Sequence, residues 1–240
     1  MDRDIQPTGQ PAGPDPHLVL DLRDVSPMAL TLAVPARSLL MIQVTDWRQA
    51  ATLIDLATGR AKPRSGTVRF LGRDWATLPP IQAEAMRGRI GYVLRDGNWL
   101  DSLTVFDNIL LPRRYHTRRP LAELEDDAVD LATRLGLPGV PLGFPAEVGV
   151  EDLQRAACIR AFLGRPALVI LEEPTRSLAA DVFLEPLVNV IRLARDREAA
   201  VFWFTQNPAI WGDPSLPATG RYRLRDVLHR MVMPASGGRA

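Results

Sequence analysis

The chain contains a single cysteine, Cys158, and no long apolar run. One cysteine cannot form an internal disulfide, which fits folding in a reducing compartment. Cys158 falls inside an apolar helical pattern, so we interpret it as a small core residue rather than a nucleophile. No stretch approaches the roughly 20 apolar residues that a membrane-spanning helix needs, and the N-terminus lacks the apolar core of a signal peptide. We therefore expect a soluble protein, which leaves docking on a membrane partner open.

An excess of charge of one sign is also missing. The 29 lysine and arginine residues oppose 28 aspartate and glutamate residues, so the formal net charge is +1. This balance supplies no broad field for steering nucleic acid, and we expect no nucleic-acid partner. The three histidines are dispersed, and their spacing predicts no metal site. At 240 residues the chain is long enough for one α/β domain that carries a smaller inserted subdomain.

The pattern along the chain predicts three parts. Residues 1–16 contain four prolines and no periodicity that could bury a face, which predicts a disordered arm. Residues 17–211 alternate strand and helix patterns and form the predicted domain, and residues 212–240 are a proline- and arginine-rich tail with one possible strand or helix. The predicted strands are residues 18–25, 29–34, 39–44, 65–74, 89–96, 168–171 and 199–207. The predicted helices are residues 52–58, 79–88, 102–112, 121–137, 150–164 and 182–197.

The segment LVILEEPT at residues 168–175 indicates where chemistry would take place. Four consecutive apolar residues lead into Glu172, Glu173 and a proline, which is typical of a buried parallel strand that ends at a site. Ligands bind at the carboxyl ends of strands in open α/β sheets. The alternative is a core strand that leaves the sheet through a solvated turn. A second ambiguous segment is the basic turn at residues 113–120, RRYHTRRP, which we predict to be a solvated loop rather than a patch for headgroups or a partner.

Taken in order, these segments resemble the ATP-binding subunit of ABC transporters over residues 18–210. SGTVRFLGRD at 65–74 matches the turn after the family's first helix, and residues 154–175 match the stretch from the signature helix through the Walker B strand. DSLTVFDNILLP at 101–112 looks most like the subunits of Mla-type phospholipid transporters, with the cell-division and lipoprotein-release branches close to it. The resemblance implies an α/β, P-loop NTPase-like ABC ATPase core with a mainly parallel sheet, an antiparallel β subdomain, and a helical subdomain at about residues 97–165.

The family's phosphate-binding loop has the form G-x-x-x-x-G-K-[ST]. Its glycines let backbone N–H groups surround phosphate, while the lysine and hydroxyl serve the terminal phosphates and magnesium. By resemblance, the three glycine positions are occupied by Val44, Trp47 and Gln49. The lysine position is Ala50, the magnesium-ligand position is Ala51, and Thr52 follows it. Ala50 offers no cation, and Asp46 adds an anion where a triphosphate would lie. Two like charges about 4 Å apart repel by roughly 4 kcal/mol at an effective dielectric of about 20, so we expect the usual phosphate binding to fail.

The other motif positions also lack the residues that the family uses to bind nucleotide. Arg95 stands where the family has the glutamine that links nucleotide to the membrane domain, and VGVED at residues 148–152 stands in place of the LSGGQ signature. Its two carboxylates suit a helix N-terminus and would repel a partner's γ-phosphate. Ala179 occupies the D-loop aspartate position. Gln206 occupies the switch-histidine position, although a glutamine can orient water in some nucleotide hydrolases.

Walker B is the motif that remains recognisable. The resemblance places Glu172 at the magnesium-associated aspartate and Glu173 at the catalytic carboxylate, which makes Glu173 the candidate catalytic residue. The positions equivalent to the family's ATP site are Ala50, Ala51, Thr52, Glu172, Arg95 and Gln206. In the family each ATP site joins the phosphate loop of one subunit to the signature of the other. Because this chain has lost both, neither a homodimer nor a heterodimer with an intact ATPase would have a complete site. The two glutamates are then relics of the fold, paired with arginines such as Arg95.

Three hypotheses follow from the resemblance. The first is a pseudo-ATPase subunit of a lipid-related transporter, which lies on the cytoplasmic face of the cell membrane, docks on a permease and pairs with an ABC-fold subunit, and needs no cofactor. The second is a divergent but working ATPase that uses ATP and magnesium, with Glu173 polarising water. The third is a free-standing regulatory or interaction module that kept the fold and lost the transporter.

Overall fold

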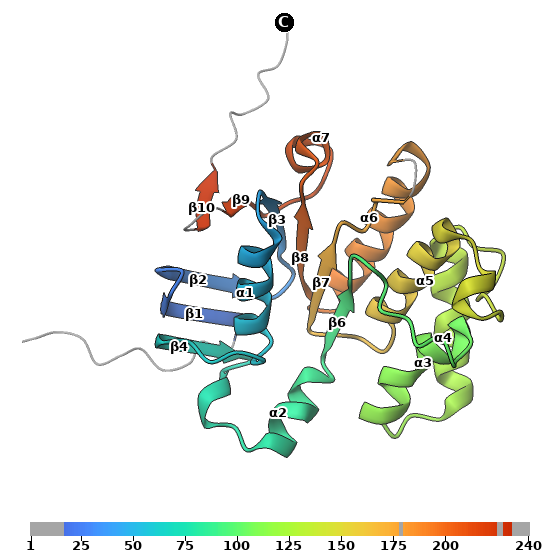
Figure 1. Cartoon of the computed structure of the whole chain (residues 1–240), viewed down its shortest axis with the longest axis horizontal. Coiled ribbons are helices and arrows are strands. Elements are labelled where there is room, and N and C mark those ends of the chain that lie inside the picture. The colour runs from blue at the N-terminus through green and yellow to red at the C-terminus, as the bar shows by residue number, and fades with distance from the viewer. Residues whose placement is uncertain (1–16, 178–179, 225–227, 232–240) are drawn as a thin grey trace, which may run out of the picture.

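The computed structural model describes residues 17–177, 180–224 and 228–231 (Figure 1). The predicted arm at residues 1–16 and the D-loop position Ala179 lie outside the described residues. The strands are β1 (Leu18–Ser26), β2 (Leu30–Pro35), β3 (Leu39–Val44), β4 (Ser65–Phe70), β5 (Arg73–Asp74), β6 (Ile90–Val93), β7 (Leu168–Glu172), β8 (Ala200–Thr205), β9 (Gly220–Leu224) and β10 (Leu228–Met231). The helices are α1 (Trp47–Ala57), α2 (Pro80–Arg87), α3 (Val105–His116), α4 (Leu121–Arg134), α5 (Val150–Phe162), α6 (Ala180–Asp196) and α7 (Pro208–Gly212), with short 3-10 turns at Trp75–Thr77 and Pro145–Glu147.

The main sheet has the strand order β10-β9-β3-β8-β7-β6, with β9, β3, β8, β7 and β6 parallel and β10 antiparallel to β9. Its central strands β3, β7 and β8 are mostly apolar because both faces are covered. In β3, Leu39 and Met41 join a core with the helices α3 to α6, whereas Leu40 and Ile42 join a second core with α1 and strands β1, β2 and β4. The mainly parallel α/β sheet expected from the sequence is confirmed.

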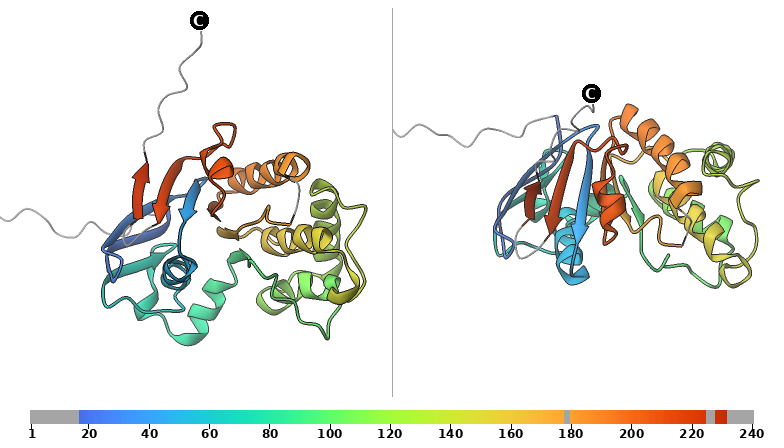
Figure 2. Two further views of the ribbon diagram at one scale, coloured as in Figure 1. Left: turned by 45° about the horizontal axis from the view of Figure 1, so that its top comes forward. Right: turned by 90° about the horizontal axis from the view of Figure 1, so that it is seen from above.

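The second sheet is antiparallel, with the order β2-β1-β4-β5. Its burial alternates along β2, where Leu30, Leu32 and Val34 are buried and the residues between them are exposed. This period of two gives one face to the core and the other to solvent. Figures 1 and 2 show this sheet and α1 on one side of the main sheet and the helices α3 to α5 on the other, which confirms the predicted antiparallel and helical subdomains.

Most elements lie where the sequence places them, with three corrections. The first concerns the basic turn. The helix α3 continues through Pro112 to His116, and Arg113 is buried with its Nη1 donating to the carbonyl oxygen of Gly88 at 2.6 Å. Its stem packs beside Gly164, where a Cβ would stand 2.7 Å from the Arg113 Cδ. Burial lowers the pKa of Arg113 to about 10. Residues 113–116 are therefore helical rather than a loop, and Arg113 is buried, whereas residues 114–116 are exposed as predicted.

The second correction concerns α1, which begins at Trp47, five residues before its predicted start at 52. The main sheet also extends past residue 211, where the predicted domain ended, because β9 pairs in parallel with β3. The predicted strand or helix in the tail is thus a strand at Gly220–Leu224 and another at Leu228–Met231. No helix within the described residues has the length and apolar character needed to cross a membrane.

The contact between α5 and the edge strand β6 depends on Gly91. A Cβ at this position would overlap the backbone carbonyl oxygen of Ala161, so only glycine lets the helix approach. We expect Gly91→Ala to lower the free energy of unfolding by about 1–3 kcal/mol, as overpacking does. Chemical denaturation measures this change. Gly139→Ala is the matched control, since no described atom lies within 4 Å of a Cβ at Gly139. Equal stabilities of the two variants would contradict the packing argument.

Candidate functional site

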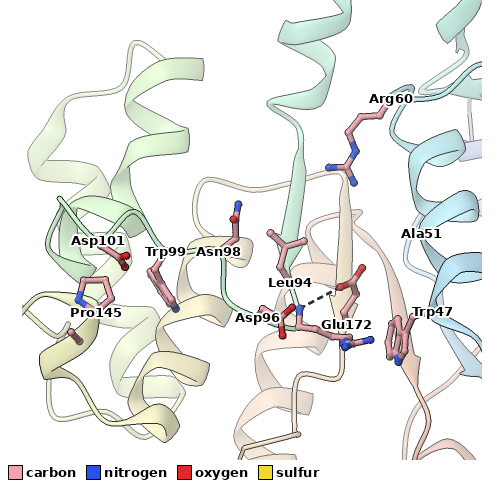
Figure 3. Close-up of a pocket in the computed structure, with 12 residues that line it drawn as sticks. Trp47, Ala51, Arg60, Leu94, Asp96, Asn98, Trp99, Asp101, Pro145 and Glu172 are labelled. Carbon is pink, nitrogen blue, oxygen red and sulfur yellow. Dashed lines mark hydrogen bonds between the residues drawn. The ribbon is translucent and has the colours of Figure 1, made fainter.

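The candidate site lies at the carboxyl ends of the central strands. A cavity of about 900 Å³ opens there between α1, the residues after β6 and the end of β7 (Figure 3). Its lining residues are Trp47, Ala51, Arg60, Leu94, Arg95, Asp96, Asn98, Trp99, Asp101, Pro145, Ala146 and Glu172. A second cavity of about 690 Å³ adjoins it and is lined by Trp47, Arg95, Glu173, Thr175, Arg176, Gln206 and Asn207. The predicted positions Ala51, Arg95, Glu172, Glu173 and Gln206 therefore do come together.

The phosphate-loop positions do not form a loop. Only Thr45 and Asp46 separate β3 from α1, and no residue from 44 to 52 has a positive φ angle. Asp46 caps the helix, its side chain accepting a hydrogen bond from the Arg48 N–H at 2.9 Å. The Asp46 carbonyl oxygen accepts from the N–H groups of Gln49 at 3.2 Å and Ala50 at 3.4 Å. Three N–H groups of the first turn are thus bonded to one residue of the same chain.

Asp46 is the anion that this helix N-terminus binds. The backbone hydrogen bond from Arg48 lowers the pKa of the Asp46 carboxyl, and a side-chain hydrogen bond from Arg48 lowers it further. Helix N-termini favour anions because their first N–H groups lack intrahelical partners. An aspartate directly before the helix is a known N-cap signal in sequence, and it would have predicted the early start of α1. Registering residues 44–52 on the family's phosphate-binding loop placed a loop there instead.

The side chains that would replace the family's lysine and magnesium hydroxyl are absent. Ala50 is fully buried in the core beneath the antiparallel sheet, and Ala51 is exposed with only a methyl group to present. The Thr52 hydroxyl is used within the helix, donating to the Arg48 carbonyl oxygen at 2.9 Å. ATP with magnesium, which the fold implies, therefore does not fit these residues. Within the described ranges, no group of three or more His, Cys, Asp or Glu side chains could hold a metal ion.

Glu172 is bound to the neighbouring strand and to the segment after it. Its Oε1 accepts from the Tyr92 hydroxyl at 2.6 Å, and its Oε2 accepts from the Arg95 backbone N–H at 3.3 Å. Arg60 lies over the Tyr92 ring, with its guanidinium carbon 5.4 Å from the ring centre. The expected pairing of Glu172 with the arginine side chain is wrong, since Arg95 offers its backbone N–H instead.

Glu173 ties the end of β7 to the end of β8. Its Oε2 accepts from the Thr205 hydroxyl at 2.9 Å, and its Oε1 accepts from the backbone N–H of Gln206. The Glu173 N–H donates to the Phe204 carbonyl oxygen at 2.9 Å, and the residue has a φ angle of 45°. Both carboxylate oxygens are therefore already engaged, and Gln206 contributes its backbone rather than its side chain.

The Arg95 side chain stacks on Trp47, a contact that the sequence did not predict. Its guanidinium carbon lies 4.6 Å from the centre of the indole ring. Both residues line both cavities, so the pair separates the two spaces.

The signature positions lie at a helix N-terminus, as expected: Glu151 and Asp152 lie in the first turn of α5, and Arg155 pairs with them at 3.9 and 3.2 Å.

The fold defines a class: an α/β domain with the architecture of an ABC ATP-binding cassette. The dimeric structure of MJ0796, a bacterial ABC transporter cassette, aligns with a TM-score of 0.73 over 87% of this chain and 92% of that chain, at 18% identity. A structure described as the ATP binding subunit of an ABC transporter aligns with a TM-score of 0.72 at 19% identity, over 87% of this chain and 86% of that chain. These likenesses establish the fold.

The sequence comparison then establishes the family. The ABC transporter family profile matches residues 51–176, more than half of the chain, and the chain therefore belongs to the ABC transporter family. The match begins at Ala51, directly after the lysine position. The uncharacterized ABC transporter ATP-binding protein YvcR of Bacillus subtilis is 32% identical over 157 residues, 65% of this chain and 60% of that protein. The bacitracin export ATP-binding protein BceA of Halalkalibacterium halodurans is 27% identical over 158 residues, 65% of this chain and 62% of its own length. The aligned part thus spans about three fifths of each relative.

The Tyr92–Glu172 pair gives a pH-dependent prediction. Desolvation raises the pKa of Tyr92 well above its usual value, and the hydrogen bond to Glu172 and that carboxylate's charge raise it further. The folded state therefore holds this proton above pH 10, and the stabilisation it gives is lost as pH rises beyond the unfolded value. We expect the phenolate absorbance at about pH 10.5 to be the same in Tyr92→Phe and the parent chain, because Tyr92 is not yet ionised. A lower absorbance in Tyr92→Phe would contradict this protonation state.

Proposed function

We propose that this protein is the nucleotide-binding-domain subunit of a membrane transporter and that it holds the ABC fold without hydrolysing ATP. The observation that carries the proposal is the N-terminus of α1, where three N–H groups are bonded to Asp46. A phosphate would have to displace that carboxylate and overcome its charge. No cation at Ala50 compensates, and the hydroxyl expected at Ala51 is missing.

The partner in this proposal is a permease on the inner face of the cell membrane. A groove of about 310 Å³ next to the candidate site suits such docking, with an apolar lining and few charges. It is lined by Ile90, Gly91, Tyr92, Leu94, Asn98, Leu100, Asn108, Leu111, Pro112, Arg113 and Arg160. A second ABC-fold subunit, either the same chain or an intact ATPase, completes the proposed assembly.

The proposed substrate is lipid-related. This part of the proposal is supported by the segment DSLTVFDNILLP at residues 101–112, which resembles Mla-type phospholipid transporters. The relatives carry other names: BceA is called a bacitracin export protein, and the MetN 1 of Rhodopseudomonas palustris, 29% identical over 181 residues, is called a methionine import protein. That alignment covers 75% of this chain and 48% of the relative.

A divergent ATPase is the second candidate, and one observation favours it. Glu173 remains at the carboxyl end of β7, beside a cavity of about 690 Å³ that also contains Gln206. If this candidate holds, a magnesium-dependent turnover exists that disappears in Glu173→Gln. A trace background that is unchanged in Glu173→Gln rejects it. The third candidate, a free-standing regulatory module, requires that no permease associates with the chain.

Calorimetry tests the loss of nucleotide binding. We expect no saturable heat when the purified chain is titrated with millimolar ATP and magnesium, because the first N–H groups of α1 are occupied by Asp46. An ABC ATP-binding subunit with a complete G-x-x-x-x-G-K-[ST] loop, titrated under the same conditions, is the positive control. Saturable, magnesium-dependent binding in the micromolar range by this chain would end the pseudo-ATPase proposal.

Affinity purification from native membranes tests the partner. We expect a stoichiometric multi-pass subunit to co-purify with the chain and to be lost in Leu111→Asp, which places a charge in the proposed docking groove. Leu121→Asp is the matched control, because Leu121 on α4 is 44% exposed and Leu111 is 41% exposed, but Leu121 lies outside the groove. Capture that is equal in both variants would reject the groove. Absence of any permease from the unmutated chain would favour the regulatory module.

A further inference from the structure

The segment between β6 and α3 crosses from the main sheet to the helical subdomain. We call residues 94–101 of this segment the strap. Figure 3 shows Leu94, Asp96, Asn98, Trp99 and Asp101 along it, on the side of the cavity opposite α1. The strap has no helix or strand of its own, and Gly97 and Asn98 have positive φ angles of 71° and 48°. Apart from one turn hydrogen bond, from the Gly97 N–H to the Leu94 carbonyl oxygen at 3.0 Å, the described hydrogen bonds that hold the strap come from its surroundings.

The first end of the strap is fixed to the core. The Arg95 backbone N–H donates to Glu172 Oε2 at 3.3 Å, and the guanidinium carbon lies 4.6 Å from the centre of the Trp47 ring on α1. These contacts reach two elements on either side of the cavity, the strand end of β7 and the first turn of α1. A planar guanidinium stacks on an indole face with favourable electrostatics, so the contact has a preferred geometry.

The second end is fixed to the helical subdomain. Arg160 on α5 donates to the carbonyl oxygens of Gly97 and of Asn98, the latter at 3.4 Å, and lies 4.4 Å from the centre of the Trp99 ring. Burial lowers the pKa of Arg160 to about 10, which still leaves it charged at neutral pH. Asn108 on α3 is 3% exposed and accepts from the Leu100 N–H at 2.9 Å while donating to the Leu100 carbonyl oxygen at 3.0 Å.

The strap is also a wall of the proposed docking groove. Leu94, Asn98 and Leu100 line that groove, while Leu94, Arg95 and Asn98 line the cavity on its other side. Fixing the strap therefore fixes one side of the surface that would receive a partner.

We propose that Arg95 and Trp47, together with Arg160 and Trp99, hold the strap in place without any ligand and so keep the docking groove preformed. The occupant of the groove rests on the proposed function, whereas the state of the strap does not. A nucleotide is not needed to order the segment, because the stacked arginines and Glu172 already do so. The pair Arg95–Trp47 acts as a positioning contact across the cavity.

Amide hydrogen exchange of the full chain, measured by mass spectrometry without nucleotide, tests this proposal. The strap amides with acceptors are those of Arg95, Gly97 and Leu100. In Arg95→Gln and in Trp47→Leu we expect the peptide covering residues 94–104 to exchange about tenfold faster, the size of effect that a partly desolvated cation–π contact provides. Peptides from β7 and β8 keep their exchange rates, which separates a released strap from a destabilised fold.

Two further variants keep the test decisive. Arg48→Gln is the matched control, because it removes an exposed arginine next to Trp47 that makes no contact with the strap. Arg160→Lys keeps a cation at the second end but loses the planar stacking on Trp99, and we expect it also to speed exchange of the strap. Strap exchange that is equal in the unmutated chain, Arg95→Gln, Trp47→Leu and Arg160→Lys would overturn the proposal. So would exchange of the unmutated strap at the rate of an unstructured peptide. If the unmutated chain captures no permease but its strap amides are protected from exchange, the proposed function is contradicted and the proposal on the strap is not.

Discussion

The hydrogen bonds between Asp46 and the first turn of α1 determine what this end of the sheet can bind. A helix N-terminus that follows a parallel strand is an anion site by default, since its first N–H groups have no intrahelical acceptor. Here the acceptor is built into the chain, two residues after β3. An N-cap of this kind stabilises a helix by about 1 kcal/mol. The carboxylate that caps α1 therefore takes the Arg48 N–H and places a negative charge at this helix N-terminus.

The fold does not depend on that site, because its stability comes from two apolar cores on opposite faces of one sheet. In β3, Met41 and Ile42 point to different cores, and both are fully buried. Each such side chain contributes about 1.5–3 kcal/mol through burial. The two cores therefore support the ABC architecture without a contribution from the groups at the candidate site.

The sequence predicted the strands and the positions that surround the cavities, but not the contacts that these residues make, for a physical reason. A strand such as β8, with apolar residues on both faces, can be predicted from the composition and period of its own residues. The contact of Trp47 with Arg95 joins residues 48 positions apart, and no local pattern records it. Arg113 was missed likewise, because its burial depends on the absence of a side chain at Gly164, in the turn after α5. The start of α1 was recoverable from Asp46, but the family's loop pattern placed a loop there.

The two glutamates show why a preserved motif is weak evidence for preserved chemistry. A carboxylate at a general-base position can also have a structural use, because each of its oxygens can accept more than one hydrogen bond. Both Glu173 oxygens accept hydrogen bonds from Thr205 and Gln206 at the end of β8, and both Glu172 oxygens accept from Tyr92 and from the strap. Removing either carboxylate would leave donors at the sheet edge without acceptors, which is costly when they are buried. The need to join β7 to its neighbours is therefore sufficient reason for these acids to remain, and hydrolysis need not be invoked to explain them.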